Sequence, residues 1–238
     1  MFMAKQERLT LSKLSEKDFP YIKKLDREQE DMVEKLYKHK RIITNAKAGT
    51  GKTTVLTQAM NALKKKEYIN KIYYVVFPVQ ERSVGYLPGG IADKIGEYAV
   101  PFYQALTEAG VNPQYLNLEL MTSSFNDFEF KVVPHTFLRG RTIENAGIIV
   151  DEIQNGTLEE IKKTLTRCTD SCYIAMIGHT GQIDIKQKDS GFSALIHHFK
   201  QGRLSGEFEG VEFAELTKNY RGEFSTFADK LGTYKNEV

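Results

Sequence analysis

The clearest chemistry in this 238-residue chain lies in one glycine-rich segment, which reads AKAGTGKTT over residues 46–54. Small residues let successive backbone N–H groups turn inward around an anion, and a helix that begins there adds the positive end of its dipole. Lys52 can reach the β- and γ-phosphates of a nucleotide, and the Thr53 hydroxyl can ligate Mg²⁺. Ala46 stands where glycine is usual, but alanine is small enough for the turn. The predicted nucleotide-binding residues here are Ala46, Lys47, Ala48, Gly49, Thr50, Gly51, Lys52, Thr53 and Thr54.

Two adjacent carboxylates, Asp151 and Glu152, follow the apolar run 147–150. In open parallel sheets, ligands bind at the carboxyl ends of the strands. We therefore expect Asp151, with Thr53, to hold Mg²⁺, commonly through a water. Glu152 is expected to accept a proton from the water that attacks the γ-phosphate.

Two polar residues farther along the chain extend this site. Gln182 follows the apolar run 171–178 and could reach the γ-phosphate or its attacking water. Arg221, near the C-terminus, could neutralise charge in the transition state. The predicted catalytic residues are then Lys52, Asp151, Glu152, Gln182 and Arg221.

Alternating strand and helix patterns must position these residues. Apolar and β-branched runs predict strands at 41–45, 71–77, 128–133, 147–150, 171–178 and 211–216. Helical patterns follow Asp26 and cover 53–66 and 91–109, the last with a break at Pro101. Strands that alternate with helices favour a single α/β domain, with a mostly parallel sheet and helices on both faces.

Composition and charge narrow the class of protein. The chain is 41% hydrophobic and 27% charged, which is typical of globular proteins, and its start is charged instead of signal-like. No apolar run reaches the roughly 18 residues that a membrane span needs, so we expect a cytoplasmic protein without a membrane partner. A net charge of +2 permits nucleic-acid binding without requiring it.

The only two cysteines are Cys168 and Cys172. Their spacing could place both on one face of a helical turn, but no other His or Cys pair lies at zinc-site spacing from them. We expect two reduced thiols in a reducing compartment.

Longer stretches resemble the PhoH family of P-loop ATPases, which are relatives of superfamily-one helicases. The resemblance covers about residues 25–231 and is most specific at 81–89 (ERSVGYLPG) and 138–146 (LRGRTIENA). The second stretch runs into Asp151-Glu152-Ile153-Gln154-Asn155, as in the family. Ser190-Gly191-Phe192, shortly after Gln182-Ile183-Asp184, is also similar.

The resemblance implies a RecA-like core and roles for matching residues. Gln29 looks like the glutamine that reads adenine, and Gln154 like the fourth residue of the helicase Asp-Glu-Ala-Gln box. Gln182 resembles the γ-phosphate sensor, and Arg221 an arginine that contacts the γ-phosphate. The family's usual Gly-Asp before the sensor loop is Gly178-His179 here, and we interpret His179 as a loop residue in preference to an altered sensor.

The resemblance also implies a domain organisation and an assembly. We expect an N-terminal extension at residues 1–24 and a RecA-like ATPase domain at 25–238. A helicase binds ATP between two such units, so a neighbouring subunit must supply the second wall, which predicts a ring-like homo-oligomer and a hexamer in particular. The candidates for an arginine supplied across the interface are Arg139, Arg141 and Arg167. Short chains of this type resemble stand-alone bacterial and phage proteins, and a phage-encoded copy would act in the host cytoplasm.

Three functions fit these patterns. The leading hypothesis is a Mg²⁺-dependent ATPase that acts on RNA or single-stranded DNA as a helicase or remodelling factor. A P-loop kinase for a small molecule would need an acceptor pocket, whereas Gln182 and the acidic box favour water as the acceptor. A nucleotide-gated assembly module with little turnover is the third, against which the intact Glu152 argues.

Overall fold

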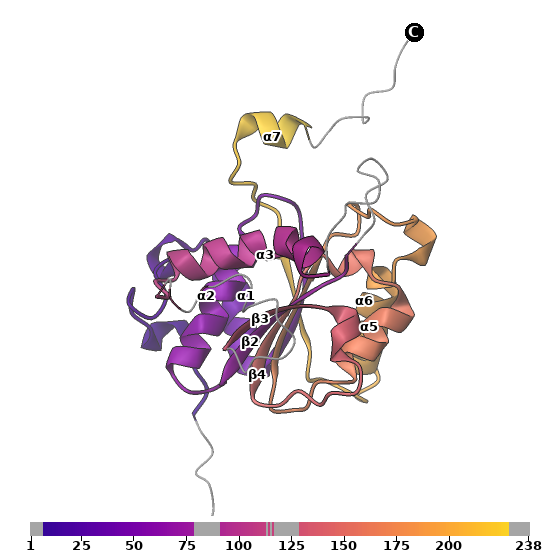
Figure 1. Ribbon diagram of the computed structural model, residues 1–238, viewed down its shortest axis with the longest axis horizontal. Helices are drawn as coiled ribbons and strands as arrows, with labels where there is room; N and C mark the ends of the chain where they lie inside the picture. Colours follow the sequence, from indigo (N-terminus) through magenta and orange to yellow (C-terminus); the bar gives the residue numbers. More distant parts are fainter. Residues whose placement is uncertain (1–6, 79–90, 113, 115, 117–128, 229–238) are drawn as a thin grey trace, which may run out of the picture.

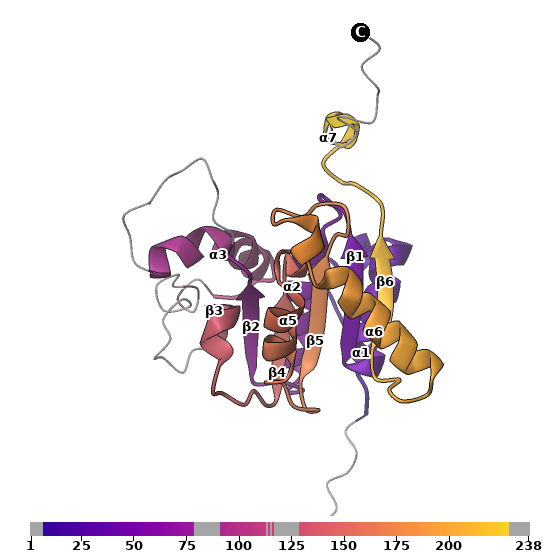
Figure 2. The same cartoon turned by 90° about the vertical axis from the view of Figure 1, so that its right-hand side faces the viewer.

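One six-stranded parallel sheet forms the centre of the computed structural model, which describes residues 7–78, 91–112, 114, 116 and 129–228. The strand order is β3-β2-β4-β5-β1-β6, and every neighbouring pair is parallel. Figure 2 shows the strands side by side with their carboxyl ends at one edge. The strands are β1 (Arg41–Ala46), β2 (Lys71–Val76), β3 (Phe130–Pro134), β4 (Ala146–Val150), β5 (Tyr173–Gly178) and β6 (Glu212–Leu216).

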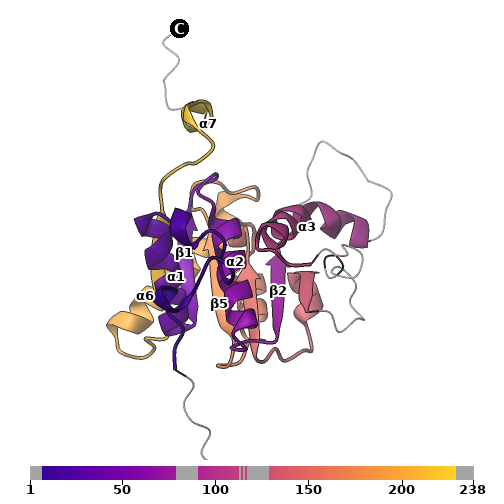
Figure 3. The ribbon, with the colours of Figure 1, turned by 90° about the vertical axis from the view of Figure 1, so that its left-hand side faces the viewer.

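Helices cover both faces of this sheet. One face carries α1 (Arg27–His39), α2 (Lys52–Lys65) and α3 (Ile91–Glu108), and the other carries α5 (Leu158–Leu165) and α6 (Phe192–Leu204) (Figures 1 and 3). A short helix, α7 (Glu223–Ala228), lies beyond the end of β6, apart from the sheet (Figure 1). Short 3₁₀ turns are η1 (Leu11–Lys13), η2 (Ile22–Lys24), η4 (His135–Leu138), η5 (Ile153–Asn155) and η6 (Gln187–Asp189). The predicted α/β architecture, parallel sheet and two helical layers are confirmed.

The sheet separates two apolar cores. Along β2, Tyr74 packs under α1–α3, whereas Val75 faces the α5–α6 side, as the alternation of a strand requires. Every residue of β4 and β5 is buried, which explains why both appear in the sequence as continuous apolar runs. Within the described ranges, no helix combines the length and apolar character that crossing a membrane requires.

The helix predicted after Asp26 is α1, and its first turn is held by a capping box. The Asp26 carboxylate accepts from the Gln29 backbone N–H, and the Gln29 side chain accepts from the Asp26 backbone N–H. The helix ends at His39 and is capped by Lys40, whose φ of 67° is left-handed. The capping box at the first turn fixes the direction of the Gln29 side chain.

The predicted break at Pro101 is wrong, because α3 continues through it. Proline removes one backbone hydrogen bond from a helix. The buried side chains Ala99, Phe102 and Leu106 tie the turns on both sides of Pro101 to the sheet, and this packing outweighs the lost bond.

The N-terminal segment contributes to the same core. Leu9 and Phe19, both within the predicted extension 1–24, are buried against α1 and α2 residues. The Tyr21 backbone N–H donates to Oε1 of Gln58 on α2. The boundary after residue 24 stays a prediction.

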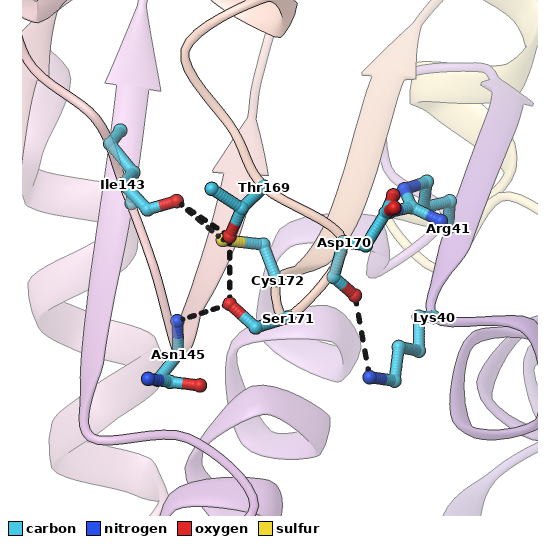
Figure 4. Close-up of polar contacts among 8 residues, drawn as sticks. All are labelled: Lys40, Arg41, Ile143, Asn145, Thr169, Asp170, Ser171 and Cys172. Carbon is cyan, nitrogen blue, oxygen red and sulfur yellow. Dashed lines mark hydrogen bonds and ion pairs between the residues drawn. The ribbon is translucent and has the colours of Figure 1, made fainter.

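Polar contacts close the opposite edge of the sheet, where the strands begin (Figure 4). The Cys172 thiol donates to the Ile143 carbonyl at 3.2 Å, and the Asn145 N–H donates to Ser171 Oγ at 2.8 Å. The helical turn suggested for the cysteines is wrong, since Cys168 lies in the turn after α5 and Cys172 directly precedes β5. Both thiols are free, and burial raises the pKa of Cys168 to about 12. These thiols therefore pack and bond at the far edge from the glycine-rich loop.

Candidate functional site

The glycine-rich loop connects β1 to α2 at the carboxyl edge of the sheet. Gly49 and Gly51 have φ angles of 77° and 73°, which are left-handed values that glycine adopts without strain. Gly51 is the N-cap of α2 and has no side chain with which to cap it, so the first N–H groups of the helix are left for a ligand. The Thr50 hydroxyl closes the turn by donating to the Lys47 carbonyl at 3.0 Å. The loop has the geometry of an anion site.

Asp151 follows β4 and touches the loop directly. Its Oδ2 accepts from the Thr53 hydroxyl at 2.9 Å, and its Oδ1 accepts from the Glu152 N–H at 2.9 Å. The Asp151 backbone N–H donates to the Val75 carbonyl, so β2 also holds this residue. Asp151 is only 4% exposed.

The donors at this point fit Mg²⁺. That ion prefers oxygen ligands and is commonly bound by one or two carboxylates together with substrate phosphates. Thr53 and Asp151 supply a hydroxyl and a carboxylate in mutual contact. Across the ranges that the structure describes, no cluster of three or more His, Cys, Asp or Glu could form a protein-only metal site. The residues therefore suit a metal ion that arrives with a phosphate ligand.

Glu152 lies beside the loop lysine. Its Oε1 is 3.3 Å from Lys52 Nζ, and its other oxygen accepts from Gln154 Nε2. Glu152 has a φ of 48°, an unusual value for a residue with a side chain. Gln154 is buried and its Oε1 accepts from the His179 N–H at 3.2 Å. Gln154 thus connects the acidic pair to the turn after β5.

The segment after β6 packs onto the same loop. The Tyr220 N–H donates to the Gly49 carbonyl at 2.8 Å. A Cβ on Gly49 would lie 2.5 Å from Asn219 Oδ1 and 3.1 Å from Arg221 Cδ. Arg221 is therefore positioned at the loop of its own chain.

Gln29 reaches the loop from α1. Its Nε2 donates to the Thr50 carbonyl at 3.0 Å, while its Oε1 accepts from the Asp26 N–H. A side-chain amide has a second N–H and a second lone pair. The described residues leave both positions to a ligand, and Gln29 lines the pocket described next.

A pocket of about 760 Å³ joins most of the predicted residues. Those in its lining are Gln29, Ala48, Gly49, Gly51, Lys52, Thr53, Thr54, Asp151, Glu152 and Arg221. Ala46, Lys47, Thr50 and Gln182 are not in the lining, and the Gln182 backbone N–H donates to the His179 carbonyl at 3.4 Å in the turn after β5. Side chains that sequence reasoning missed also line it, namely Tyr21, Lys24, Tyr74, Tyr98 and Tyr220.

Two of these tyrosines bond to carboxylates of the site. The buried Tyr74 hydroxyl donates to Asp151 Oδ2, and the Tyr220 hydroxyl donates to Asp26 Oδ2. Burial, followed by the Asp26 carboxylate, raises the pKa of Tyr220 to about 12. Nothing in the sequence alone pairs these residues, because the pairing depends on the order of the strands and on the path after β6.

Comparison with known proteins decides the family. The model for "PhoH-like protein" matches residues 21–220. This chain belongs to the PhoH family. It is 31% identical over 172 residues to a PhoH-like protein of Mycobacterium tuberculosis H37Rv, covering 71% of this chain and 46% of the relative. It is 30% identical over 176 residues to Protein PhoH of Escherichia coli K12, covering 69% and 46%. The chain thus spans about half the length of these relatives.

A solved structure shows the same fold. The large terminase of a thermophilic bacteriophage, in complex with ADP, matches with a TM-score of 0.53 at 11% identity, over 89% of this chain and 50% of the terminase chain. At that identity the likeness concerns the fold alone. A RecA-like P-loop domain is therefore confirmed for this PhoH-family chain.

The remaining predicted residues lie elsewhere in the chain. His179 shapes its turn, because its Nδ1 accepts from the Gly181 N–H at 3.3 Å. Arg139 and Arg141 are exposed after η4. The Arg167 carbonyl accepts from the Ile143 N–H on the approach to β4, at the edge opposite the loop. The PhoH-like stretch 81–89 lies outside the described residues.

Proposed function

We propose that this PhoH-family chain binds ATP with Mg²⁺ and hydrolyses its β–γ phosphoanhydride. One observation carries the proposal: two direct contacts, Thr53 to Asp151 at 2.9 Å and Lys52 to Glu152 at 3.3 Å, join the phosphate loop to the acidic pair. Such a junction supports the proposal, because the terminal phosphate of a nucleotide bound by the loop would lie next to a carboxylate base. The family match supports nucleotide hydrolysis in general.

Different residues of the chain bind the phosphates and activate the attacking water. The loop N–H groups and Lys52 bind the β- and γ-phosphates, and the arriving phosphate draws Lys52 away from Glu152. The released Glu152 carboxylate then accepts a proton from the attacking water, while Gln154 holds it in place. Bound with the nucleotide by Thr53 and Asp151, Mg²⁺ would neutralise phosphate charge.

Three residues complete the proposed site. Gln29 reads adenine with its remaining amide positions, and Arg221 neutralises charge on the γ-phosphate within its own subunit. Gln182 contacts the γ-phosphate or the water after the turn that follows β5 moves toward the pocket. The ADP-bound terminase supports the nucleotide assignment, because its domain shares this fold.

We further propose that turnover is coupled to RNA or single-stranded DNA in a homo-oligomer, a hexamer in particular. The single sheet supports this idea, since it forms one wall of the site. The sequence resembles those of superfamily-one helicases, and its net charge of +2 is mildly basic. Both properties are compatible with a nucleic-acid partner.

The deciding measurement is phosphate release from ATP with no added acceptor, with and without single-stranded RNA or DNA. We expect Mg²⁺-dependent release by the wild type. Lys52→Ala and Glu152→Gln should lower it at least a hundredfold, since phosphate-binding and general-base groups each contribute about 10²–10⁴. Glu152→Gln should still bind ATP.

The matched controls are Lys163→Ala and Glu159→Gln. Both residues lie on α5, where they form an exposed ion pair, and both variants should retain wild-type release. Absence of phosphate release by the wild type, with either polymer or neither, would overturn the hydrolase assignment. Equal release with and without both polymers would overturn the coupling to nucleic acid.

A further inference from the structure

Tyr74 occupies a fixed place under the acidic pair. It pairs with Ile149 in the β2–β4 register, and Ile149 and Asp151 point to the same face of the sheet because they are two residues apart. The Tyr74 ring stacks on Phe102 of α3, with centroids 4.9 Å apart and an interplanar angle of 9°. The Tyr74 residue is only 3% exposed, and its hydroxyl donates to Asp151 Oδ2.

The direction of this hydrogen bond is unambiguous. An ionised carboxylate only accepts hydrogen bonds, so the Tyr74 hydroxyl is the donor and Asp151 Oδ2 is the acceptor. Tyr74 is thus a permanent donor, unlike Lys52, which the proposed mechanism moves.

The donors around Asp151 limit how it can bind a metal ion. A carboxylate has about four lone-pair positions. Thr53 and Tyr74 fill those of Oδ2, and the Glu152 N–H takes one on Oδ1. No other donor among the described residues reaches Asp151, so one position on Oδ1 remains, and a metal-bound water can fill it. Mg²⁺ gives up its waters reluctantly, so this arrangement suits Mg²⁺ better than ions that shed water easily.

We propose that Tyr74 is a positioning residue that holds Asp151 for water-mediated binding of Mg²⁺ beside the phosphate loop. The inference rests on the proposed ATP site and adds a determinant of its metal preference. Without the hydroxyl, Oδ2 regains a lone pair, and the carboxylate can turn and ligate a metal directly. Mn²⁺ accepts such a ligand more readily than Mg²⁺ does.

The test measures binding without turnover. ADP affinity of the purified protein is titrated by calorimetry in EDTA, in Mg²⁺ and in Mn²⁺. For Tyr74→Phe we expect the ADP affinity in EDTA to equal that of the wild type. The Mg²⁺ concentration that gives half of the maximal increase in ADP affinity should rise about tenfold, as expected when a residue that orients a metal ligand is lost. The Mn²⁺ requirement should rise less, so the Mg²⁺ to Mn²⁺ ratio changes.

The neighbouring tyrosine provides a matched control. Tyr73→Phe removes the same hydroxyl from the same strand, but Tyr73 packs against the core on the other face, so its metal requirement should equal that of the wild type. Phe102→Leu is a second test variant, because it loosens the Tyr74 ring and keeps the hydroxyl. The Mg²⁺ requirement of Phe102→Leu should lie between those of the wild type and Tyr74→Phe.

The outcomes separate the two proposals. If the ADP affinity of the wild type is the same in EDTA and in Mg²⁺, the metal-dependent ATP site itself is refuted. If the wild type responds to Mg²⁺, and neither Tyr74→Phe nor Phe102→Leu raises the requirement more than twofold, the role of Tyr74 is refuted. Equal rises in Tyr73→Phe and Tyr74→Phe would refute it as well.

Discussion

Gly49 shows how one residue can serve both the backbone and the site. Its φ of 77° is left-handed, and its missing side chain leaves the space that Asn219 and Arg221 occupy. The first requirement is local, since any L-residue is strained there. The second is tertiary, since it is the approach of the segment after β6 that forbids a Cβ. Only the first could be predicted from the glycine-rich pattern.

Gly49→Ala separates these two requirements when it is compared with Gly110→Ala. Gly110 also has a left-handed φ of 71°, but a Cβ there would have no neighbour within 4 Å. Both changes should lower the free energy of unfolding by about 1–2 kcal/mol through backbone strain. Only Gly49→Ala should also displace Arg221 and weaken ADP binding, by roughly tenfold or more.

Urea unfolding and calorimetric ADP titration measure the two effects. Because a Cβ at Gly110 would meet no atom within 4 Å and Gly110 does not line the pocket, its variant reports strain alone. If both variants bound ADP as tightly as the wild type, Arg221 and Asn219 would not depend on the shape of the loop.

At the scale of elements, the carboxyl ends of β1 and β4 bring the loop and the acidic pair together. Each strand was predictable from its own residues, because β-branched and apolar runs specify strands locally. The acidic pair was predictable because parallel strands present their carboxyl ends to ligands. The bond between Tyr74 and Asp151 was not, since it depends on β2 lying beside β4, which is a long-range pairing. The continuity of α3 through Pro101 was missed for the same reason, because tertiary packing decides it.

The charged side chain of Asp18 attaches the N-terminal segment to Lys66, which directly follows α2. Asp18 accepts from the Ser15 N–H and hydroxyl, and its Oδ1 lies 2.9 Å from Lys66 Nζ. The backbone bond from Ser15, followed by Lys66, lowers the pKa of Asp18 from 3.8 to about 2. A folded pKa below the unfolded one stabilises the folded state above about pH 4, and this contribution is lost as the pH falls toward 2.

Asp18→Asn should therefore destabilise the protein by about 1 kcal/mol at pH 7, a value reduced for solvent screening of the partly exposed Lys66. The difference from the wild type should shrink at pH 3, because the unfolded Asp18 carboxyl, with a pKa of 3.8, is then mostly protonated while the folded one is still mostly ionised. Urea midpoints at both pH values measure it. Asp189→Asn, on the exposed turn η6, is the control and should shift neither midpoint appreciably. An Asp18→Asn effect of equal size at pH 7 and pH 3 would contradict the charge-based explanation.

At the scale of the whole molecule, the two edges of the sheet differ. β6 forms one edge and leads to Arg221, which packs on the loop of its own chain. β3 forms the other edge and leads through η4 to the exposed Arg139 and Arg141. A head-to-tail ring repeats one interface between unlike surfaces, so the β3 side of one copy can face the next copy's site. Arg139 and Arg141 therefore suit the proposed trans arginine better than Arg167 does.

Mixing two inactive variants tests this assembly. Arg139→Ala would keep its own site but lack the arginine for its neighbour, whereas Lys52→Ala would lack a working site but keep the arginine. Each alone should hydrolyse ATP at least a hundredfold more slowly than the wild type, since a trans arginine contributes about 10³–10⁵ in rate. In an equal mixture, roughly a quarter of random head-to-tail interfaces pair an intact site with an intact arginine, so phosphate release should return to about that share of the wild-type rate.

Arg221→Ala mixed with Lys52→Ala should not recover, because each change disables the site of the subunit that carries it, so every site in the mixture is defective. Arg141→Ala is mixed in the same way, and light scattering gives the size of each sample. Wild-type hydrolysis by a monomer, or no recovery with either exposed arginine, would exclude a trans arginine from this side of the fold.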